Sequence, residues 1–156
     1  MKGLLADLGL AACPRFYGDS QLALAMAGGA VVWLVAWIFF PDLLAPPRQG
    51  ALLASLILWQ PLLEELLFRG VLQGQLRLWQ WGREKHFGIS RANLATSVLF
   101  VLGHMVYHAP LWALAVFVPS LLFGYFRERH ACIYSALVLH VYYNAGYFLI
   151  GLYGAG

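Results

Sequence analysis

Two carboxylates and one guanidinium lie within six positions of an otherwise apolar stretch of the chain. Glu64, Glu65 and Arg69 follow residues 51–63, whose apolar run is broken by one serine, one glutamine and one proline. An ionised side chain at the centre of a bilayer costs about 2.5–3.5 kcal/mol on insertion scales. Ionisable groups retained at such a depth face protein or water and are functional by default. These three residues are therefore the first candidates for chemistry.

Helical spacing assigns different directions to the three side chains. Glu65 and Arg69 are four residues apart, so they share a face and are expected to form an ion pair. Glu64 is rotated by about 100° from Glu65, which makes it the candidate general base toward water. Pro61 lacks an N–H, so it is expected to free the carbonyl of Ile57 and to bend the helix. The alternative is that the three charges form a purely structural ion-pair cluster.

Two histidines and an amide are the other unusual groups at membrane depth. His104 lies in one apolar stretch, whereas His140 and Asn144 lie four residues apart on another. A carboxylate can deprotonate water, and imidazoles with an amide can orient that water and stabilise the oxyanion formed at a carbonyl. The expected site has no cofactor. A zinc site built from His104, His140 and Glu64 is the chemical alternative.

The elements that must position these groups are apolar helices. Hydrophobic residues make up 62% of the 156 residues and charged residues 11%, whereas soluble chains have roughly 25% charged residues. About 20 apolar residues span a bilayer, and five stretches approach that length. They are residues 21–40, 50–76, 92–109, 111–126 and 131–153.

The composition predicts an all-α, polytopic membrane helix bundle. We expect about five transmembrane helices in one integral membrane domain over residues 1–156, with a motif-bearing core over about 50–153 and a short interfacial helix before residue 20. No basic helical face is present, which argues against nucleic-acid binding. Cys13 and Cys132 have no metal-binding pattern around them and are expected to be free thiols.

The basic residues indicate an orientation in the membrane. With five spans, eight Lys and Arg residues fall on one side and Arg48 alone on the other, with Arg69 left out because it lies inside a span. The eight are Lys2, Arg15, Arg77, Arg83, Lys85, Arg91, Arg127 and Arg129. The positive-inside rule then predicts a multi-pass protein of the plasma (inner) membrane, with a cytoplasmic N-terminus and an external C-terminus.

Three short motifs together resemble those of one known family. They are Glu64-Glu65-x-x-x-Arg69, Phe100-x-x-x-His104 and His140-x-x-x-Asn144. In that order, on three separate apolar stretches, they are similar to the motifs of the CPBP intramembrane proteases. That family includes CAAX prenyl endopeptidases, bacteriocin-processing proteins and abortive-infection-type proteins.

The resemblance implies a glutamic intramembrane endopeptidase without an obligatory metal. By it, Glu64 activates the water, and the remaining site residues position the water and oxyanion or support the site. Those residues are His104, His140 and Asn144 in the first role, and Glu65 and Arg69 in the second. The implied partner, apart from the lipid bilayer, is a membrane-embedded or lipid-adjacent protein. It is a CAAX-type prenyl protein, a bacteriocin or leader peptide, or a protein with a C-terminal sorting tag.

Other functions remain open from the sequence. A non-catalytic immunity or scaffold protein could retain the same residues, and a zinc-dependent intramembrane protease would use the same histidines. A proton-coupled transporter also places Glu and His inside a membrane. The lack of an internal repeat in the sequence argues against the transporter.

Overall fold

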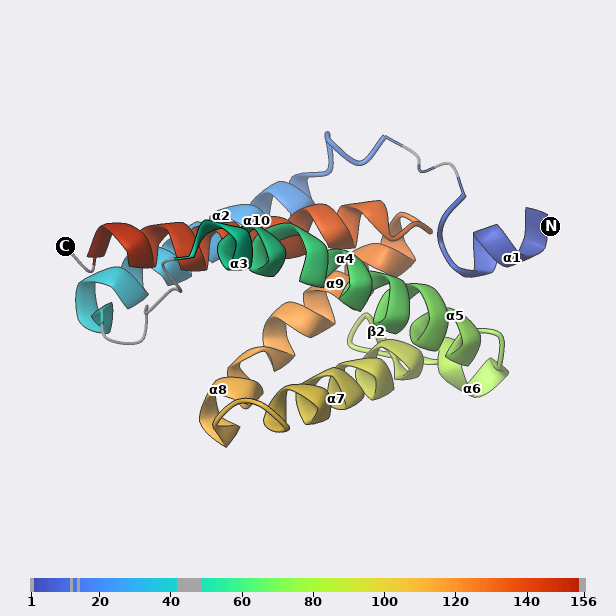
Figure 1. Cartoon of the computed structure of the whole chain (residues 1–156). Coiled ribbons are helices and arrows are strands. Elements are labelled where there is room, and N and C mark those ends of the chain that lie inside the picture. The colour runs from blue at the N-terminus through green and yellow to red at the C-terminus, as the bar shows by residue number, and fades with distance from the viewer. Residues whose placement is uncertain (1, 12, 14, 42–48, 155–156) are drawn as a thin grey trace. The chain divides into compact units, whose positions relative to one another are not determined.

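The computed structural model describes residues 2–11, 13, 15–41 and 49–154, and nearly all of its regular structure is helical (Figure 1). The chain divides into two compact units, each described here by itself. Unit 1 comprises residues 1–14 and 64–136, and unit 2 comprises residues 15–63 and 137–156. Arg48, from the charge count above, lies outside the described residues.

Within the described ranges, four helices rather than five are long and apolar enough to cross a membrane. They are Ser20–Phe39, Gly50–Leu76, Pro110–Arg129 and Tyr134–Leu152. The stretch over residues 92–109 holds a shorter helix than expected, because helix α7 covers only Arg91–Met105. Fifteen residues reach about 22 Å at 1.5 Å per residue, short of a hydrocarbon core of about 30 Å. Ala109 precedes a proline and is extended, with ψ 143°, which prevents α7 from continuing.

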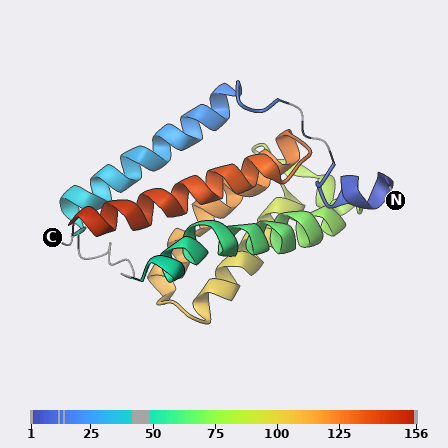
Figure 2. The same cartoon turned by 45° about the horizontal axis from the view of Figure 1, so that its top comes forward.

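Unit 2 is built on helix α2 (Ser20–Phe39) and most of helix α10 (Tyr134–Gly154), which run side by side (Figure 2). The Tyr143 hydroxyl donates to the carbonyl of Ala25 at 2.9 Å. Its ring lies against Gly29, where an added Cβ would lie 2.5 Å from Cε1 of Tyr143. Gly146 gives the ring of Trp33 the same close access to α10. Small residues on each helix thus admit an aromatic ring from the other.

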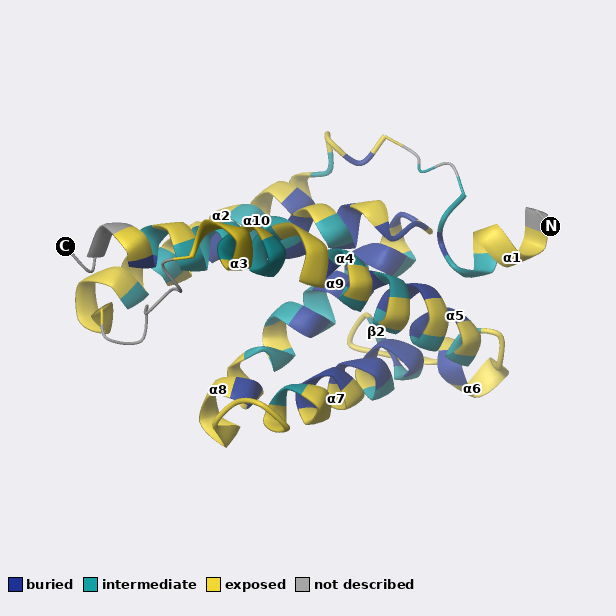
Figure 3. Ribbon diagram, in the orientation of Figure 1, coloured by how far each residue is buried: buried dark blue, intermediate teal, exposed yellow. Residues whose placement is uncertain are grey.

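Helix α2 begins where its sequence provides a cap. The Asp19 carboxylate accepts hydrogen bonds from the backbone N–H groups of Gln21 and Leu22, which satisfies donors that a helix start leaves free. Leu22 and Gly29 are the buried positions of α2, and most others are exposed (Figure 3). An apolar helix exposed on most of its surface suits contact with lipid rather than water.

Unit 1 places helices α7 and η3 against helix α9. Its elements in chain order are α1 (Lys2–Asp7), η3 (Glu65–Leu72), α5 (Gln73–Leu76), α6 (Gln80–Arg83), β1 (Lys85–His86), β2 (Ile89–Ser90), α7, α8 (Pro110–Ala115) and α9 (Phe117–Arg129). The strands β1 and β2 form an antiparallel hairpin that the sequence analysis did not predict. Its two-residue turn, Phe87-Gly88, has φ 51° and 83°, the positive values that a type I′ turn requires.

Glu128 joins the polar ends of several unit 1 segments. It accepts hydrogen bonds from Gln73 Nε2 at 2.9 Å and from the Ser90 hydroxyl. It also pairs with Arg77 at 3.8 Å and with Lys85 at 3.9 Å, while its own side chain is 5% exposed. Arg77 and Lys85 are among the basic residues that the charge count places on one side of the membrane.

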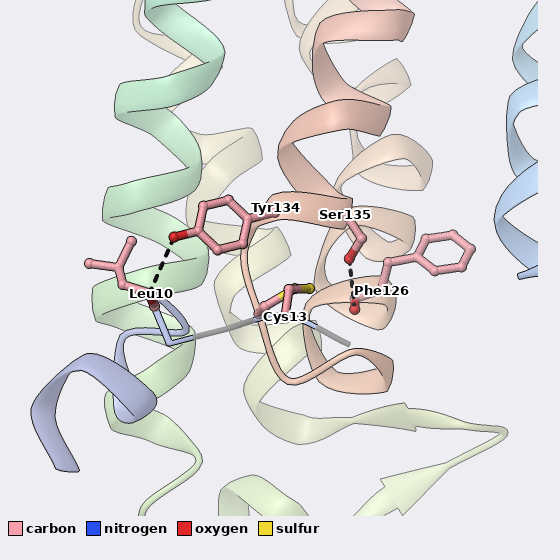
Figure 4. Close-up of a disulfide and its surroundings, with 6 residues drawn as sticks. Leu10, Cys13, Phe126, Tyr134 and Ser135 are labelled. Carbon is pink, nitrogen blue, oxygen red and sulfur yellow. Dashed lines mark hydrogen bonds between the residues drawn. A yellow bond between two sulfur atoms is a disulfide. The ribbon is translucent and has the colours of Figure 1, made fainter. Parts of the chain in front are cut away.

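A disulfide and several hydrogen bonds join the N-terminal segment to the rest of unit 1. The expectation that the two cysteines are free thiols is therefore wrong. Cys13 and Cys132 form a disulfide with their Cα atoms 5.5 Å apart (Figure 4). Nearby, Ile133 N–H donates to the carbonyl of Gly9 at 3.0 Å, and the Tyr134 hydroxyl donates to Leu10. These bonds bring together two cysteines that are 119 residues apart in sequence, a proximity that no local pattern indicates.

Two glycines allow this segment to approach the helix that bears the carboxylates. A Cβ at Gly70 would lie 3.2 Å from the carbonyl oxygen of Leu8, and one at Gly74 would lie 2.5 Å from that of Asp7. The pair Gly70 and Gly74 therefore packs against backbone carbonyls at the C-terminal end of α1. Arg127 secures the contact, because Nη2 donates to the Asp7 carbonyl at 2.8 Å and Nε donates to the Arg69 carbonyl at 3.3 Å.

Candidate active site

The two glutamates lie where one helix changes its hydrogen-bond register. The apolar helix Gly50–Leu76 consists of α3 (Gly50–Ala54), the π-helix η2 (Ser55–Trp59), α4 (Gln60–Glu64), the π-helix η3 and α5. Glu64 is the last residue of α4 and Glu65 is the first of η3. π-Turns are rare, bond residue i to i+5, and concentrate at functional sites. The adjacent carboxylates therefore belong to different helical registers.

Pro61 has its effect one residue earlier than expected. Gln60 N–H donates to the carbonyl of Ser55, a bond of π register. In that register the carbonyl of Leu56 is opposite Pro61, which has no N–H to donate. The Leu56 carbonyl instead accepts a hydrogen bond from Asn144 Nδ2 at 2.9 Å, within unit 2. The predicted release of a carbonyl therefore applies to Leu56, not to Ile57.

The ion pair predicted from spacing is present and wholly buried. Arg69 Nε lies 3.4 Å from Glu65 Oε2, and both side chains are 0% exposed. Arg69 Nη2 donates to Ser120 twice, to its hydroxyl oxygen at 2.8 Å and to its carbonyl at 2.9 Å. The guanidinium carbon also lies 4.8 Å from the Phe100 ring centre and 5.4 Å from that of Phe123. The ion pair, the two hydrogen bonds of Nη2 and the aromatic faces stabilise the buried cation, although Nε and Nη1 donate no hydrogen bond to a described residue.

The neighbouring carboxylate has different surroundings. Glu64 is half-buried, whereas Glu65 is completely buried. Since α4 ends at Glu64 and η3 begins at Glu65, the two side chains leave the helix in different directions. One carboxylate is thus held in an ion pair inside unit 1, while the other remains partly accessible at the adjoining position.

His104 is fixed by the motif that precedes it. Its Nδ1 lies 2.9 Å from the carbonyl of Phe100, and since a carbonyl only accepts, Nδ1 carries the hydrogen. This hydrogen bond fixes the tautomer and the orientation of the imidazole. Phe100 contacts both the His104 ring, at 4.4 Å between centroids, and Arg69. On the other side, His108 and Trp112 stack with His104 at 5.9 and 6.0 Å.

The six predicted residues are divided between the two units. Unit 1 contains Glu64, Glu65, Arg69 and His104, and it links the last two through Phe100. Unit 2 contains His140 and Asn144, one turn apart on α10. His140 is 5% exposed, and the Asn144 amide is oriented by its bond to Leu56. Leu56 belongs to the same continuous helix that bears the carboxylates.

Sequence reasoning missed Ser120 and the aromatic faces around Arg69. Ser120 is 51 residues from Arg69 and belongs to no recognised motif. The available signal was weak, since Ser120 and Gly124 are small residues one turn apart in an apolar stretch. Among the residues that the structure describes, no three His, Cys, Asp or Glu side chains are grouped as ligands for one metal ion.

Fold and site define a class of protein. The chain is an all-α, polytopic membrane protein that encloses a carboxylate–guanidinium pair within one of its apolar helices. The family model of the type II CAAX prenyl endopeptidases, Rce1-like, matches residues 46–146, a range that includes all six predicted site residues. The chain belongs to this family of membrane proteases, and the resemblance drawn from the three motifs is confirmed. No significant match was found among curated proteins or among solved structures.

Proposed function

We propose that this protein is an intramembrane endopeptidase in which Glu64 activates a water molecule to hydrolyse a peptide bond of a membrane-associated substrate. The observation that supports this mechanism is the pairing of a wholly buried Glu65–Arg69 ion pair with a half-buried Glu64 at the next position. Burying charge inside an apolar helix costs free energy. A structural role for the pair would not require the second, more accessible carboxylate.

The other polar residues have separate parts in this mechanism. Glu64 takes a proton from water, which then attacks the scissile carbonyl. His104 and His140 orient the water and stabilise the oxyanion. Asn144 shares that role, and its bond to Leu56 restricts the rotation of its amide. Glu65 and Arg69 hold the helical turn that presents Glu64.

The proposed substrate is a protein that reaches the membrane by its own lipid or apolar segment. Family membership supports a prenylated protein with a C-terminal CAAX motif as the first candidate. A leader peptide and a C-terminal sorting tag are the other candidates. We place the N-terminus in the cytoplasm of a plasma-membrane protein, as the Lys and Arg count indicates. The disulfide at that end favours an oxidising compartment instead, and a reporter fused to the N-terminus distinguishes the two orientations.

Replacing Glu64 by Gln tests the mechanism, because it keeps the shape and removes the base. The purified protein would be reconstituted in liposomes with an internally quenched farnesylated CAAX peptide. Glu64→Gln should lower turnover by at least about 100-fold, the lower end of typical general-base contributions. The matched control is Glu84→Gln, since Glu84 is an exposed glutamate paired with Arg91 outside the apolar helices.

The outcome is decided by comparing the two glutamine variants and the wild type. Normal cleavage by Glu64→Gln would refute the glutamate mechanism. If the wild type leaves the prenylated peptide intact, mapping of protein termini in cells with and without Glu64→Gln would identify another substrate. Activity lost to a strong chelator and restored by zinc alone would replace the metal-free mechanism by a zinc-dependent one.

A further inference from the structure

Helix α9 contains none of the six predicted residues, yet it packs against two of the helices that do. Both η3, with Glu65 and Arg69, and α7, with His104, pack against it in unit 1. The contacts include side-chain donors that reach backbone carbonyls of α9. These are Arg69 to Ser120 at 2.9 Å, Gln73 to Gly124 at 3.0 Å and Asn93 to Leu121 at 2.9 Å.

Two of these interhelical hydrogen bonds are spaced one helical turn apart on both helices. Arg69 and Gln73 are one turn apart, and their acceptors Ser120 and Gly124 are also one turn apart. A one-turn slip or a rotation of either helix would break both bonds together. These two hydrogen bonds therefore determine which face of η3 is directed toward α9.

Ser120 differs from the other two acceptors, because its side-chain hydroxyl accepts a hydrogen bond in addition to its backbone carbonyl. Nη2 of Arg69 donates to both the hydroxyl and the carbonyl of Ser120, which uses both of its hydrogens. A guanidinium is planar, so holding Nη2 at two points limits its rotation. Nε then lies 3.4 Å from Glu65 Oε2, within ion-pair distance.

We propose that Ser120 is a positioning residue of this protease, and the proposal rests on the function proposed above. Its hydroxyl keeps the guanidinium of Arg69 within ion-pair distance of the Glu65 carboxylate. The Arg69–Glu65 pair in turn holds the turn of helix that begins immediately after Glu64. Ser120 is fully buried and acts through Arg69.

The test is the kinetics of Ser120→Ala with the quenched farnesylated peptide in liposomes. We expect kcat to fall about 10-fold, because a hydrogen bond to a charged donor is lost while the Ser120 carbonyl still accepts. KM should change less than about twofold, since no substrate contact is removed. Ser120→Thr, which keeps a hydroxyl, should recover most of kcat. A kcat for Ser120→Ala equal to that of the wild type would overturn the proposal.

The matched control is Ser135→Ala. Ser135 is also fully buried in unit 1 and its hydroxyl donates to a carbonyl, that of Phe126. It has no described bond to Arg69, so its loss should leave kcat within about twofold. If both serine variants lose the same fraction of kcat and of melting temperature, Ser120 is merely structural and the proposal fails.

A double-mutant cycle and a measurement independent of activity complete the test. In an Arg69→Lys background, Ser120→Ala should have no further effect on kcat, because it acts only through the guanidinium. Proton exchange of Arg69 Nε–H, measured by NMR on arginine-labelled protein, should be faster in Ser120→Ala than in Ser135→Ala. Equal exchange rates in the two serine variants would overturn the proposal about Ser120, whether or not the wild type cleaves the peptide. Failure of the wild type to cleave the peptide would count against the proposed function only.

Discussion

Replacing Arg69 by Met should destabilise the protein strongly, and replacing Glu65 as well should reverse most of the loss. The single change leaves the Glu65 carboxylate buried at 0% exposure without its cation. At the observed 3.4 Å, two unit charges attract by about 5 kcal/mol with an effective dielectric constant of about 20. Breaking a buried pair by removing one partner costs about 3–5 kcal/mol, so we expect a loss in that range.

The double variant Glu65→Met/Arg69→Met removes both charges and keeps an apolar side chain at each position. Exchanging a buried ion pair for packed apolar residues is often neutral or stabilising, by about 1–4 kcal/mol. The Ser120 hydroxyl loses its donor in both variants. We therefore expect the double variant to unfold with a free energy within about 1 kcal/mol of the wild type. Turnover should stay low in both variants, since neither retains the pair next to Glu64.

The assay is reversible unfolding in mixed detergent micelles, followed by tryptophan fluorescence. The same preparations are then used for turnover of the quenched peptide. A decrease in the free energy of unfolding of less than about 1 kcal/mol in Arg69→Met would refute the reasoning, because leaving a carboxylate buried without its cation costs more than that. A double variant that regains both stability and turnover would show that the ion pair does not support catalysis.

Three further predictions concern the packing and the membrane topology. Cys132→Ser should lower the free energy of unfolding by up to about 4.7 kcal/mol, the chain-entropy value for a loop of about 100 residues, since Cys13 and Cys132 are 119 residues apart; a reductant should lower the melting temperature of the wild type but not of the variant. Gly29→Ala should lower the melting temperature because its Cβ would lie 2.5 Å from the Tyr143 ring, whereas the control Gly28→Ala meets nothing within 4 Å; equal melting temperatures would contradict the packing described for α2 and α10. A reporter fused to the N-terminus should be active only in a cytoplasmic form, and activity of a periplasmic reporter there would reverse the orientation indicated by the basic residues.

The local features of the site could be predicted from residue types and spacing alone. Glu65 and Arg69 pair as expected because neighbours four apart meet on any helix, and both belong to one continuous apolar segment. The helical class followed from composition, since apolar segments can cross a bilayer only with their backbone bonds satisfied internally. The family followed from three motifs whose order along the chain needs no coordinates.

Other features depended on packing between segments that are distant in sequence. The length of α7 was overestimated because hydropathy does not show where a helix ends before Pro110. The carbonyl released by Pro61 was placed at Ile57 because an α register was assumed, whereas the π register of η2 transfers the effect to Leu56.

The sequence by itself determined the class of protein, the family and the charged helix at its centre, because apolar length, helical periodicity and motif order are properties of the chain alone. Only the tertiary structure decided what surrounds that helix. Ser120 meets Arg69 across 51 residues, and Cys13 meets Cys132 across 119. Contacts of this kind depend on which helix faces pack together, and many apolar faces of similar composition could pack equally well. The polar bonds made between those faces select one arrangement.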